Sequence, residues 1–305
     1  MGGALFTGLC AFPLTPADSE GVVDVDAVGL LIDRLAAAGV ASIGLLGSTG
    51  GFAYLDGRQR QRATQAAVEA AAGRVPIIVG IGALRTSWSR HLARDAEQAG
   101  AAGLLLQPTS YLPLTPAEVG DHYRTIAIET DLPLCIYNNP GSTNFVFSHD
   151  LIVDLATIPN IVAIKMPPLS DDAYAVELDR LRPRLSDTFR IGYSGDWVAS
   201  ASLLAGADAW FSVIGGLLPI PALQLTRAAI SNDKAAADEL DRAFEPLWKL
   251  FREHGSFRLL YVIADRLKLP LGDPPPPIRR VDASIIEAVE HAMETMAATS
   301  RPGGF

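Results

Sequence analysis

Cysteine is scarce in this chain of 305 residues, and the pattern of the two cysteines excludes several classes of site. Cys10 and Cys135 lie far apart, each inside an apolar stretch, and neither belongs to a Cys-x-x-Cys pair. This spacing indicates neither a disulfide framework nor a zinc site. We therefore predict no metal in the protein, and a reducing compartment suits its cysteines.

Positive charge and long apolar runs are also lacking. Lys and Arg number 25 against 34 Asp and Glu, and no basic run could neutralise a row of phosphates. No stretch of 18 apolar residues occurs, and the first residues lack the basic and then apolar segments of an export signal. We expect a cytoplasmic protein without nucleic-acid or membrane partners.

What the chain does have is a regular alternation of short apolar runs and longer amphipathic runs. Hydrophobic residues make up 49% of it. Short, almost continuously apolar runs are typical of parallel strands that are covered on both faces. Eight such runs are predicted strands: 5–12, 42–46, 76–81, 102–107, 133–137, 161–165, 189–193 and 209–213.

The segments between these strands read as helices with recognisable ends. Predicted helices are 26–38, 57–72, 87–99, 116–129 and 148–156, with Thr115 and Ser148 as N-caps and Gly39 and Gly100 at the C-terminal ends. Eight strand-then-helix units predict an α/β fold, a (β/α)8 TIM barrel, with a doubly wound open sheet as the alternative.

The alternation stops near the end of the eighth unit. From about residue 219 the sequence reads as helices only: 222–230, 234–253, 255–267 and 283–298. We therefore predict a catalytic barrel domain over residues 1–220 and a C-terminal helical domain over residues 221–305.

In a TIM barrel the active site lies at the carboxyl ends of the strands, so polar residues at these ends are the candidates. They are Gly47, Ser48 and Thr49 after the second strand, Tyr137 at the fifth, Lys165 at the sixth, and Gly195 and Asp196 after the seventh. The histidines lie in helices, helix starts or the C-terminal region, and no metal-binding spacing links them.

Lys165 is the sharpest single signal. The chain has four lysines against 21 arginines, and Lys165 is the lysine of the predicted barrel, at the end of the apolar run Ile161–Ile164. Arginine cannot lose its proton in a protein, whereas a desolvated lysine amine can become a nucleophile near neutral pH. Such an amine is what Schiff-base chemistry requires. The alternative is a lysine that reaches solvent or pairs with a carboxylate such as Asp196.

The residues around this lysine allow two interpretations each. The Gly-Ser-Thr-Gly-Gly turn at 47–51 offers backbone N–H groups and two hydroxyls to a small carboxylate, but it could equally be a structural turn. Tyr137 could relay protons over the same mouth, or could be a packing residue at the barrel rim.

These motifs together resemble one enzyme family. Residues 47–51 (Gly-Ser-Thr-Gly-Gly), 137–141 (Tyr-Asn-Asn-Pro-Gly) and 163–165 (Ala-Ile-Lys) occur in the order and at the distances found in dihydrodipicolinate synthases and N-acetylneuraminate lyases. A Phe-Pro-Leu-Thr turn at 12–15, a Ser-Gly-Asp loop at 194–196 and the helical extension add to the likeness. The chain is similar over nearly its whole length to these pyruvate-dependent class I aldolases.

The resemblance implies a mechanism without a cofactor. Lys165 would form an imine with C2 of pyruvate or another 2-oxo acid, and Tyr137 would relay protons. Ser48 and Thr49, in the turn that starts at Gly47, would hold the carboxylate, and Thr49 counts among the catalytic residues as well. An aldehyde-type compound would be the second substrate, and homotetramers built as dimers of dimers are the expected assembly.

The chain also departs from the family pattern at three places. Gly51 stands where the family's turn usually ends in glutamate, and Ser142 where the synthase has an arginine for its second substrate. A hydroxyl cannot replace that ion pair. Tyr111 is the one tyrosine in a segment where the synthase has two aromatics; Ser110 occupies the relay position unless the alignment shifts by one residue.

The remaining substrate-binding candidates are aromatic or lie in loops. Phe211, with Tyr193 and Trp197, would form an aromatic pocket that favours a less polar acceptor than a sialic acid. The predicted substrate-binding residues are completed by Phe211, Ser142, Gly195, Asp196 and Tyr111.

Four functions follow from these observations. We favour a Schiff-base-forming lyase that performs aldol cleavage, condensation or dehydration on pyruvate or another 2-oxo acid. The alternatives are a 4-hydroxy-tetrahydrodipicolinate synthase using pyruvate and aspartate semialdehyde, a catalytically degraded barrel that only binds a 2-oxo acid, and a phosphate-binding barrel enzyme. Ser142 argues against the second, and the retained Lys165 and Tyr137 argue against the third. Gly215-Gly216, after the eighth strand, motivates the fourth.

Overall fold

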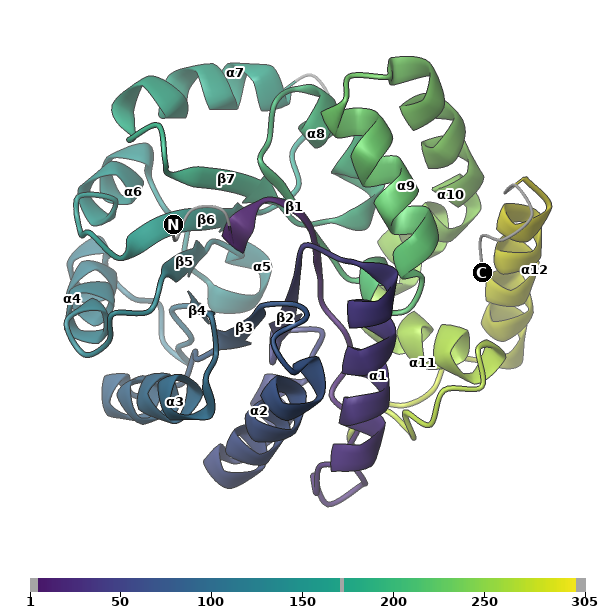
Figure 1. The fold of residues 1–305 in the computed structure, drawn as a ribbon, viewed down its shortest axis with the longest axis horizontal. Coiled ribbons are helices and arrows are strands. Elements are labelled where there is room, and N and C mark those ends of the chain that lie inside the picture. Colours follow the sequence, from purple (N-terminus) through teal and green to yellow (C-terminus); the bar gives the residue numbers. More distant parts are fainter. Residues whose placement is uncertain (1–4, 171–172, 300–305) are drawn as a thin grey trace.

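The computed structural model describes residues 5–170 and 173–299, and it contains a closed barrel of parallel strands (Figure 1). Each strand pairs with the next along the chain, and the last pairs with the first, so the predicted (β/α)8 TIM barrel is confirmed. The strands are β1 (Gly8–Ala11), β2 (Ser42–Leu45), β3 (Ile77–Gly80), β4 (Gly103–Leu106), β5 (Leu134–Tyr137), β6 (Ile161–Met166), β7 (Arg190–Tyr193) and β8 (Ala209–Ser212).

Helices surround the barrel and then continue beyond it. The barrel helices are α1 (Val25–Ala38), α2 (Gly57–Ala71), α3 (Thr86–Ala99), α4 (Pro116–Ala127), α5 (Pro140–Thr143), α6 (His149–Leu155), α7 (Ala173–Leu181), α8 (Ala199–Leu204) and α9 (Pro219–Ile230). The later helices are α10 (Lys234–His254), α11 (Ser256–Arg266) and α12 (Ala283–Thr299). Helix α9 packs on β1, α1 and α8 of the barrel and also on α10 of the extension, so the boundary at residues 220 and 221 stays a prediction.

The helix ends show the predicted capping. The Ser148 side chain accepts a hydrogen bond from the Leu151 N–H, and Thr115 and Glu118 form a reciprocal capping box with Pro116 in the first turn. Gly39 and Gly100 adopt left-handed conformations with φ of 79° and 88°. A side chain is strained in this region, so glycine is the favoured residue at these two ends.

The first strand is shorter than the apolar run that predicts it. The run covers residues 5–12, but β1 spans only Gly8–Ala11. Phe6 instead packs inside the barrel among residues of other strands, and an added Cβ on Gly103 would lie 2.4 Å from a methyl of Leu5. These two side chains close the amino end of the barrel. An apolar residue that closes the barrel and an apolar residue of a strand look the same in the sequence, so the predicted strand was too long.

The barrel interior is filled by side chains from β1, β3, β4, β5, β6 and β8, with glycines where two phenyl rings lie. A Cβ on Gly44 would lie 2.2 Å from the Phe12 ring, and one on Gly192 would lie 2.5 Å from the Phe211 ring. The two rings meet edge-to-face, with centroids 6.1 Å apart. Glycine on one strand thus makes room for phenylalanine on another, and the rings fill the barrel close to its catalytic end.

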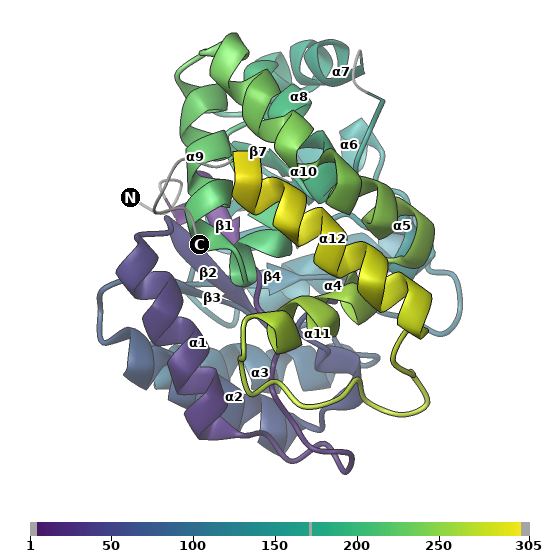
Figure 2. The ribbon, with the colours of Figure 1, turned by 90° about the vertical axis from the view of Figure 1, so that its right-hand side faces the viewer.

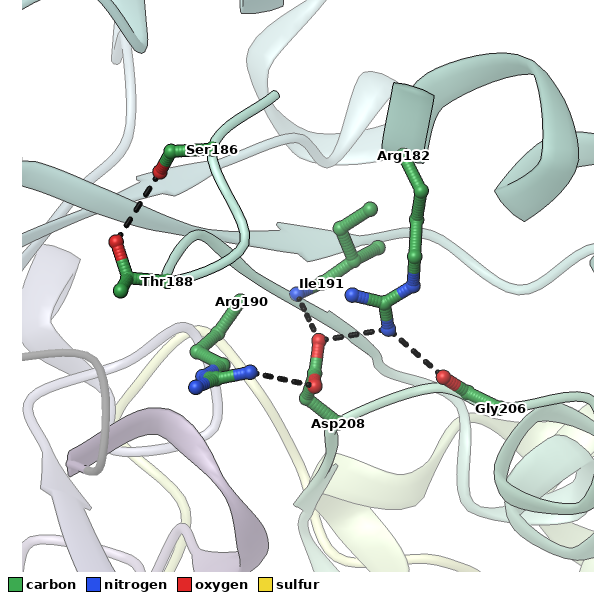
Figure 3. A network of polar contacts seen from close by, with 7 residues as sticks. All are labelled: Arg182, Ser186, Thr188, Arg190, Ile191, Gly206 and Asp208. Atoms are coloured by element: carbon green, nitrogen blue, oxygen red, sulfur yellow. Dashed lines mark hydrogen bonds and ion pairs between the residues drawn. The ribbon is translucent and has the colours of Figure 1, made fainter. Parts of the chain in front are cut away.

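A polar network joins β7 and β8 at their amino ends, far from the carboxyl ends where a TIM-barrel site lies (Figure 3). Asp208 accepts hydrogen bonds from the Ile191 N–H at 2.8 Å and from Arg182 Nη2 at 2.8 Å, and it pairs with Arg190 at 3.3 Å. Arg182 also donates to the Gly206 carbonyl at 2.7 Å. Because side chains and backbone groups of the protein already bind both oxygens of Asp208, this carboxylate joins the two strands rather than binding a ligand.

The C-terminal helices cover one side of the molecule. Figure 2 shows α12 lying across α10 and α11, and the ring of Trp248 on α10 stacks on Phe244 at 4.5 Å and meets Trp210 of β8 edge-on. The helical extension and the barrel therefore share one hydrophobic core. Over residues 5–170 and 173–299, no helix is both long and apolar enough to cross a membrane.

Candidate active site

Lys165 projects into the carboxyl-terminal part of the barrel and is 4% exposed. Its Nζ lies 4.0 Å from the centroid of the Phe12 ring, 4.5 Å from that of Tyr137 and 5.7 Å from that of Phe211. Within the described chain, no carboxylate lies within 4.0 Å of this amine. Three aromatic rings therefore lie around the amine, and the described residues do not contain the alternative of a lysine paired with a carboxylate.

Tyr137 stands beside this lysine on the neighbouring strand, since the pairing of β5 with β6 places the two residues opposite each other. The Tyr137 hydroxyl lies 3.3 Å from Ser48 Oγ and accepts a hydrogen bond from Asn139 Nδ2 at 2.9 Å. Burial alone would raise the pKa of Tyr137, but the charge of Lys165 and these hydrogen bonds outweigh it, so the pKa lies below its ordinary value. The phenol is thus prepared to give up a proton.

The turn at residues 47–51 can form only because it is rich in glycine. A Cβ on Gly47 would lie 2.8 Å from the Phe12 ring, and one on Gly50 would lie 2.9 Å from the Leu46 nitrogen. Ser48 and Thr49 are partly buried between these glycines, and Ser48 points toward Tyr137. The structure brings Gly47, Ser48, Tyr137 and Lys165 together, whereas Thr49 also lines a narrow cavity toward Tyr54 and Tyr261.

Asn139 belongs to this group of residues, although the sequence pattern assigns it no role. It precedes Pro140, where the short helix α5 begins, and its amide holds the Tyr137 hydroxyl. Ser142 lies in α5 on the exposed rim, with its hydroxyl 3.4 Å from the Asn139 carbonyl. The signal for Asn139 was its place two residues after Tyr137, at a polar strand end.

Asp196 is oriented differently from the prediction. It is 2% exposed, and its carboxylate accepts hydrogen bonds from Trp210 Nε1 at 2.9 Å, the Val213 N–H at 3.1 Å and the Ile214 N–H at 2.8 Å. Desolvation outweighs these bonds and raises the pKa of Asp196 to about 6. The carboxylate is therefore used to hold the loop after β8, and we correct its expected role as a direct substrate ligand. Its neighbour Gly195 adopts a φ of 90° against Pro168.

The predicted aromatic pocket does not form. Phe211 lies inside the barrel and close to Lys165, but Tyr193 points to the outer face of the sheet and packs edge-on against Tyr174 of α7 at 4.7 Å. The error arises because successive residues of a strand face opposite sides. Tyr111, on the loop after β4, is 88% exposed, so a single chain does not bring it into the Lys165 site.

Gln107 is a further polar residue at a strand end that was not among the candidates. It follows β4 directly, its side chain is 1% exposed, and neither its amide oxygen nor its amide nitrogen has a hydrogen-bond partner among the described residues. The signal that marks Lys165, a polar residue closing an apolar run, marks Gln107 equally.

The loop after β8 gives no support to a phosphate site. The Gly215 N–H donates to Ser212 Oγ at 2.8 Å, and the Gly216 N–H donates to the Val213 carbonyl at 3.1 Å. Both donors of the glycine pair are therefore used inside the loop. In the part of the chain that the structure describes, no group of three His, Cys, Asp or Glu side chains could hold a metal ion.

Comparison with known proteins places these residues in a family context. A profile of the dihydrodipicolinate synthetase family matches residues 5–296. The crystal structure of dihydrodipicolinate synthase from Agrobacterium tumefaciens is 52% identical, covers 97% of this chain and 100% of that one, and superposes with a TM-score of 0.95.

Two further relatives are more distant. The 4-hydroxy-tetrahydrodipicolinate synthase of Laribacter hongkongensis is 31% identical over 280 residues, which are 92% of this chain and 95% of the relative. The chloride-inhibited dihydrodipicolinate synthase of Acinetobacter baumannii, crystallised with pyruvate, is 27% identical with a TM-score of 0.86 over 96% of this chain and 99% of that one.

Proposed function

The chain belongs to the dihydrodipicolinate synthetase family, and from this premise we propose which residues carry its chemistry. It is a lyase of the class I aldolase type that forms a Schiff base with pyruvate or another 2-oxo acid. The observation that carries our assignment is the Lys165 amine, enclosed by aromatic rings and adjacent to a tyrosine whose hydroxyl reaches Ser48.

Lys165 is the nucleophile in this proposal. Its unprotonated amine attacks C2 of the 2-oxo acid, and loss of water leaves an imine that joins Nζ to C2. Removal of a proton from C3 then gives an enamine, in which C3 is nucleophilic. The aromatic surroundings exclude water from the amine, and no carboxylate of the described residues forms an ion pair with it.

Tyr137 moves the protons. Its hydroxyl can pass the proton of the attacking amine to the departing oxygen at C2, and it can later give a proton to the oxygen of the second substrate. Asn139 donates to this oxygen and so stabilises the phenolate form, while Ser48 connects it to the turn at residues 47–51. Asn139 is thus a positioning residue in the proposed mechanism.

The carboxylate of the 2-oxo acid binds at the turn after β2. The N–H groups and hydroxyls of Ser48 and Thr49 are neutral donors, and the absence of a side chain at Gly47 allows close approach of the backbone. Gly195 and Phe211 would bound the remaining space, and Ser142 and Tyr111 would contribute only at the rim.

The identity of the second substrate divides two candidate functions. The names of the relatives favour 4-hydroxy-tetrahydrodipicolinate synthase, whose second substrate is an aldehyde with a carboxylate. Ser142 opposes it, because this rim hydroxyl offers no positive charge. We favour a lyase with another aldehyde-type partner. The retained contacts of Lys165 and Tyr137 support an active enzyme over a degraded, binding-only barrel.

A homotetramer and a cytoplasmic location complete the proposal. Leu84, Trp88, Tyr111 and Leu112 expose apolar surface on α3 and on the loops after β3 and β4, which supports contact with a second copy of the chain. The two cysteines are free and buried, as suits a reducing compartment.

Reductive trapping tests the imine. The protein is incubated with pyruvate and borohydride, its intact mass is measured, and the modified peptide is mapped. We expect one adduct on Lys165, its loss in Lys165→Ala, and its retention in the control Lys249→Ala, which removes an exposed lysine of α10. Retained turnover by a folded Lys165→Ala variant would refute the mechanism.

A further inference from the structure

Gln107 has a side chain with free hydrogen-bonding capacity inside the barrel mouth. It is 1% exposed, and both Oε1 and Nε2 lack a partner within the described chain. Buried amides are normally paired, because burial removes the water that would otherwise bind them. Among residues 5–170 and 173–299, no group completes this carboxamide, so it is available to a ligand.

The strand register directs Gln107 toward the proposed catalytic residues. Leu105, two residues earlier, packs in the interior cluster with Tyr137, so the alternation of the strand turns Gln107 inward as well. The pairing of Leu105 with Cys135 and Leu106 with Ile136, continued by one residue, sets Gln107 opposite Tyr137, which itself pairs with Lys165. The three side chains form a row across β4, β5 and β6 at the carboxyl end of the barrel.

The chain makes specific room for this side chain. Gly82 follows β3, and a Cβ at this position would lie 2.4 Å from Cγ and 2.5 Å from Cδ of Gln107. The Gly82 carbonyl is in turn held by Arg60 Nη1 at 2.9 Å. The hydroxyl of Tyr137 is engaged by Ser48 and Asn139, so the carboxamide of Gln107 is left for a different atom.

We infer that Gln107 selects the second substrate, and that this substrate is an aldehyde carrying a hydroxyl group. The inference rests on the proposed function. A carboxamide donates and accepts at once and has no charge, which matches a hydroxyl better than a carboxylate or phosphate. Ser142 on the rim is also neutral, so neither it nor Gln107 supplies a positive charge for an anionic tail.

The bonds of the reaction then follow. C3 of the enamine attacks the aldehyde carbon and forms a carbon–carbon bond, while the aldehyde oxygen takes a proton from Tyr137. Water hydrolyses the imine, which restores the Lys165 amine and releases a 4-hydroxy-2-oxo acid. The hydroxyl that the aldehyde already carries exchanges hydrogen bonds with the Gln107 amide throughout. Because the aldehyde oxygen becomes a second hydroxyl, the product is a polyhydroxylated 2-oxo acid.

The test compares two aldehydes of equal carbon number, each with pyruvate. D-glyceraldehyde carries hydroxyls and propionaldehyde does not. We expect wild type to favour glyceraldehyde in kcat/KM by about tenfold or more, since a buried amide left unpaired penalises the analogue. Gln107→Leu, which keeps an apolar side chain over Gly82, should abolish this preference by lowering kcat/KM for glyceraldehyde alone.

Pyruvate trapping with borohydride is measured first, on both proteins. Failure of wild type to trap pyruvate, or any other 2-oxo acid offered in its place, refutes the proposed function itself. When trapping succeeds, an equal loss with both aldehydes in Gln107→Leu assigns the residue a structural role and overturns the inference. A wild-type protein that does not prefer glyceraldehyde over propionaldehyde, or that condenses neither aldehyde with pyruvate, also overturns the inference. Gln107→Met repeats the comparison if the leucine variant does not fold, and a chain that tolerates neither replacement contradicts the inference.

Discussion

The hydroxyl of Tyr137 has more interactions than a packing tyrosine needs. It contacts Ser48 from the turn after β2 and Asn139 from the start of α5, and its ring lies beside the Lys165 amine. These partners come from different parts of the chain and favour the ionised phenol, as the proposed proton transfer requires. Two predictions belong to this scale, because each depends on one ionisable side chain.

Replacement of Tyr137 by phenylalanine should separate binding from catalysis. The variant keeps the ring but loses the hydroxyl, so we expect kcat to fall by about 10²–10⁴-fold. Equilibrium binding of pyruvate should change much less, as monitored by quenching of intrinsic fluorescence. Tyr54→Phe, a tyrosine outside the row, is the matched control. Unchanged turnover in Tyr137→Phe would remove the relay role.

Asp196 should make folding stability depend on pH. Its pKa in the folded chain is about 6 against an ordinary 3.8, so the folded state binds this proton more tightly than the unfolded state. Its contribution to stability is therefore full below about pH 4 and is lost as the pH rises through 6. Asp196→Asn cannot ionise.

Urea unfolding of both proteins between pH 4 and 7 provides the measurement. Wild type should lose stability relative to Asp196→Asn as the pH rises from 4 to 6, and the difference should be constant above that range. A difference that does not vary with pH would mean that this carboxyl titrates at its ordinary value in the folded protein.

At the scale of elements, the barrel interior depends on pairs of glycine and phenylalanine from neighbouring strands. Gly44 of β2 and Gly47 after it lie against the Phe12 ring, and Gly192 of β7 lies against Phe211. The rings in turn lie against Lys165. The contacts between these glycines and phenyl rings thus determine both how the strands pack and what surrounds the Lys165 amine.

Gly44→Ala should therefore be strongly destabilising. The new Cβ would lie 2.2 Å from the Phe12 ring, which is buried and also lies close to Gly47, so we expect a loss of about 1–3 kcal/mol or more in the free energy of unfolding. Gly57→Ala at the start of α2 is the control, because nothing lies within 4 Å of its Cβ position. Equal stability of both variants, measured by urea unfolding, would show that the ring can move aside.

At the scale of the whole molecule, the single chain leaves large apolar side chains on the surface. Leu84, Trp88, Tyr111 and Leu112 are exposed, and Leu84 and Thr109 both line the two cavities of this region. Exposed apolar surface of this kind is typical of contact with another chain.

We expect light scattering after size exclusion to give the mass of four chains, against 32.4 kDa for one. Trp88→Glu places a charge in the proposed contact and should shift the protein to smaller species, whereas Val176→Glu, an exposed apolar residue of α7, should not. A wild-type protein that runs as one chain at micromolar concentration would contradict the assembly.

Local sequence patterns were sufficient for much of this protein. The spacing of apolar runs predicts the eight strands, and the caps at Thr115, Ser148, Gly39 and Gly100 predict helix ends, because these signals involve residues that are neighbours in the chain. Lys165 stands out for a similar reason, since a lone lysine at the end of an apolar run is visible without a fold.

Tertiary structure alone decided which polar groups have partners. The Asp196 carboxylate accepts hydrogen bonds from Trp210 and the loop after β8, and the Tyr193 ring packs against Tyr174. Asn139 donates to the Tyr137 hydroxyl, whereas the Gln107 amide has no partner among the described residues. The hydrogen bond or packing contact that settles such a role commonly involves another strand, many residues away in the chain. Closure of the barrel and the register between strands bring these groups together, and neither can be read from a short stretch of sequence.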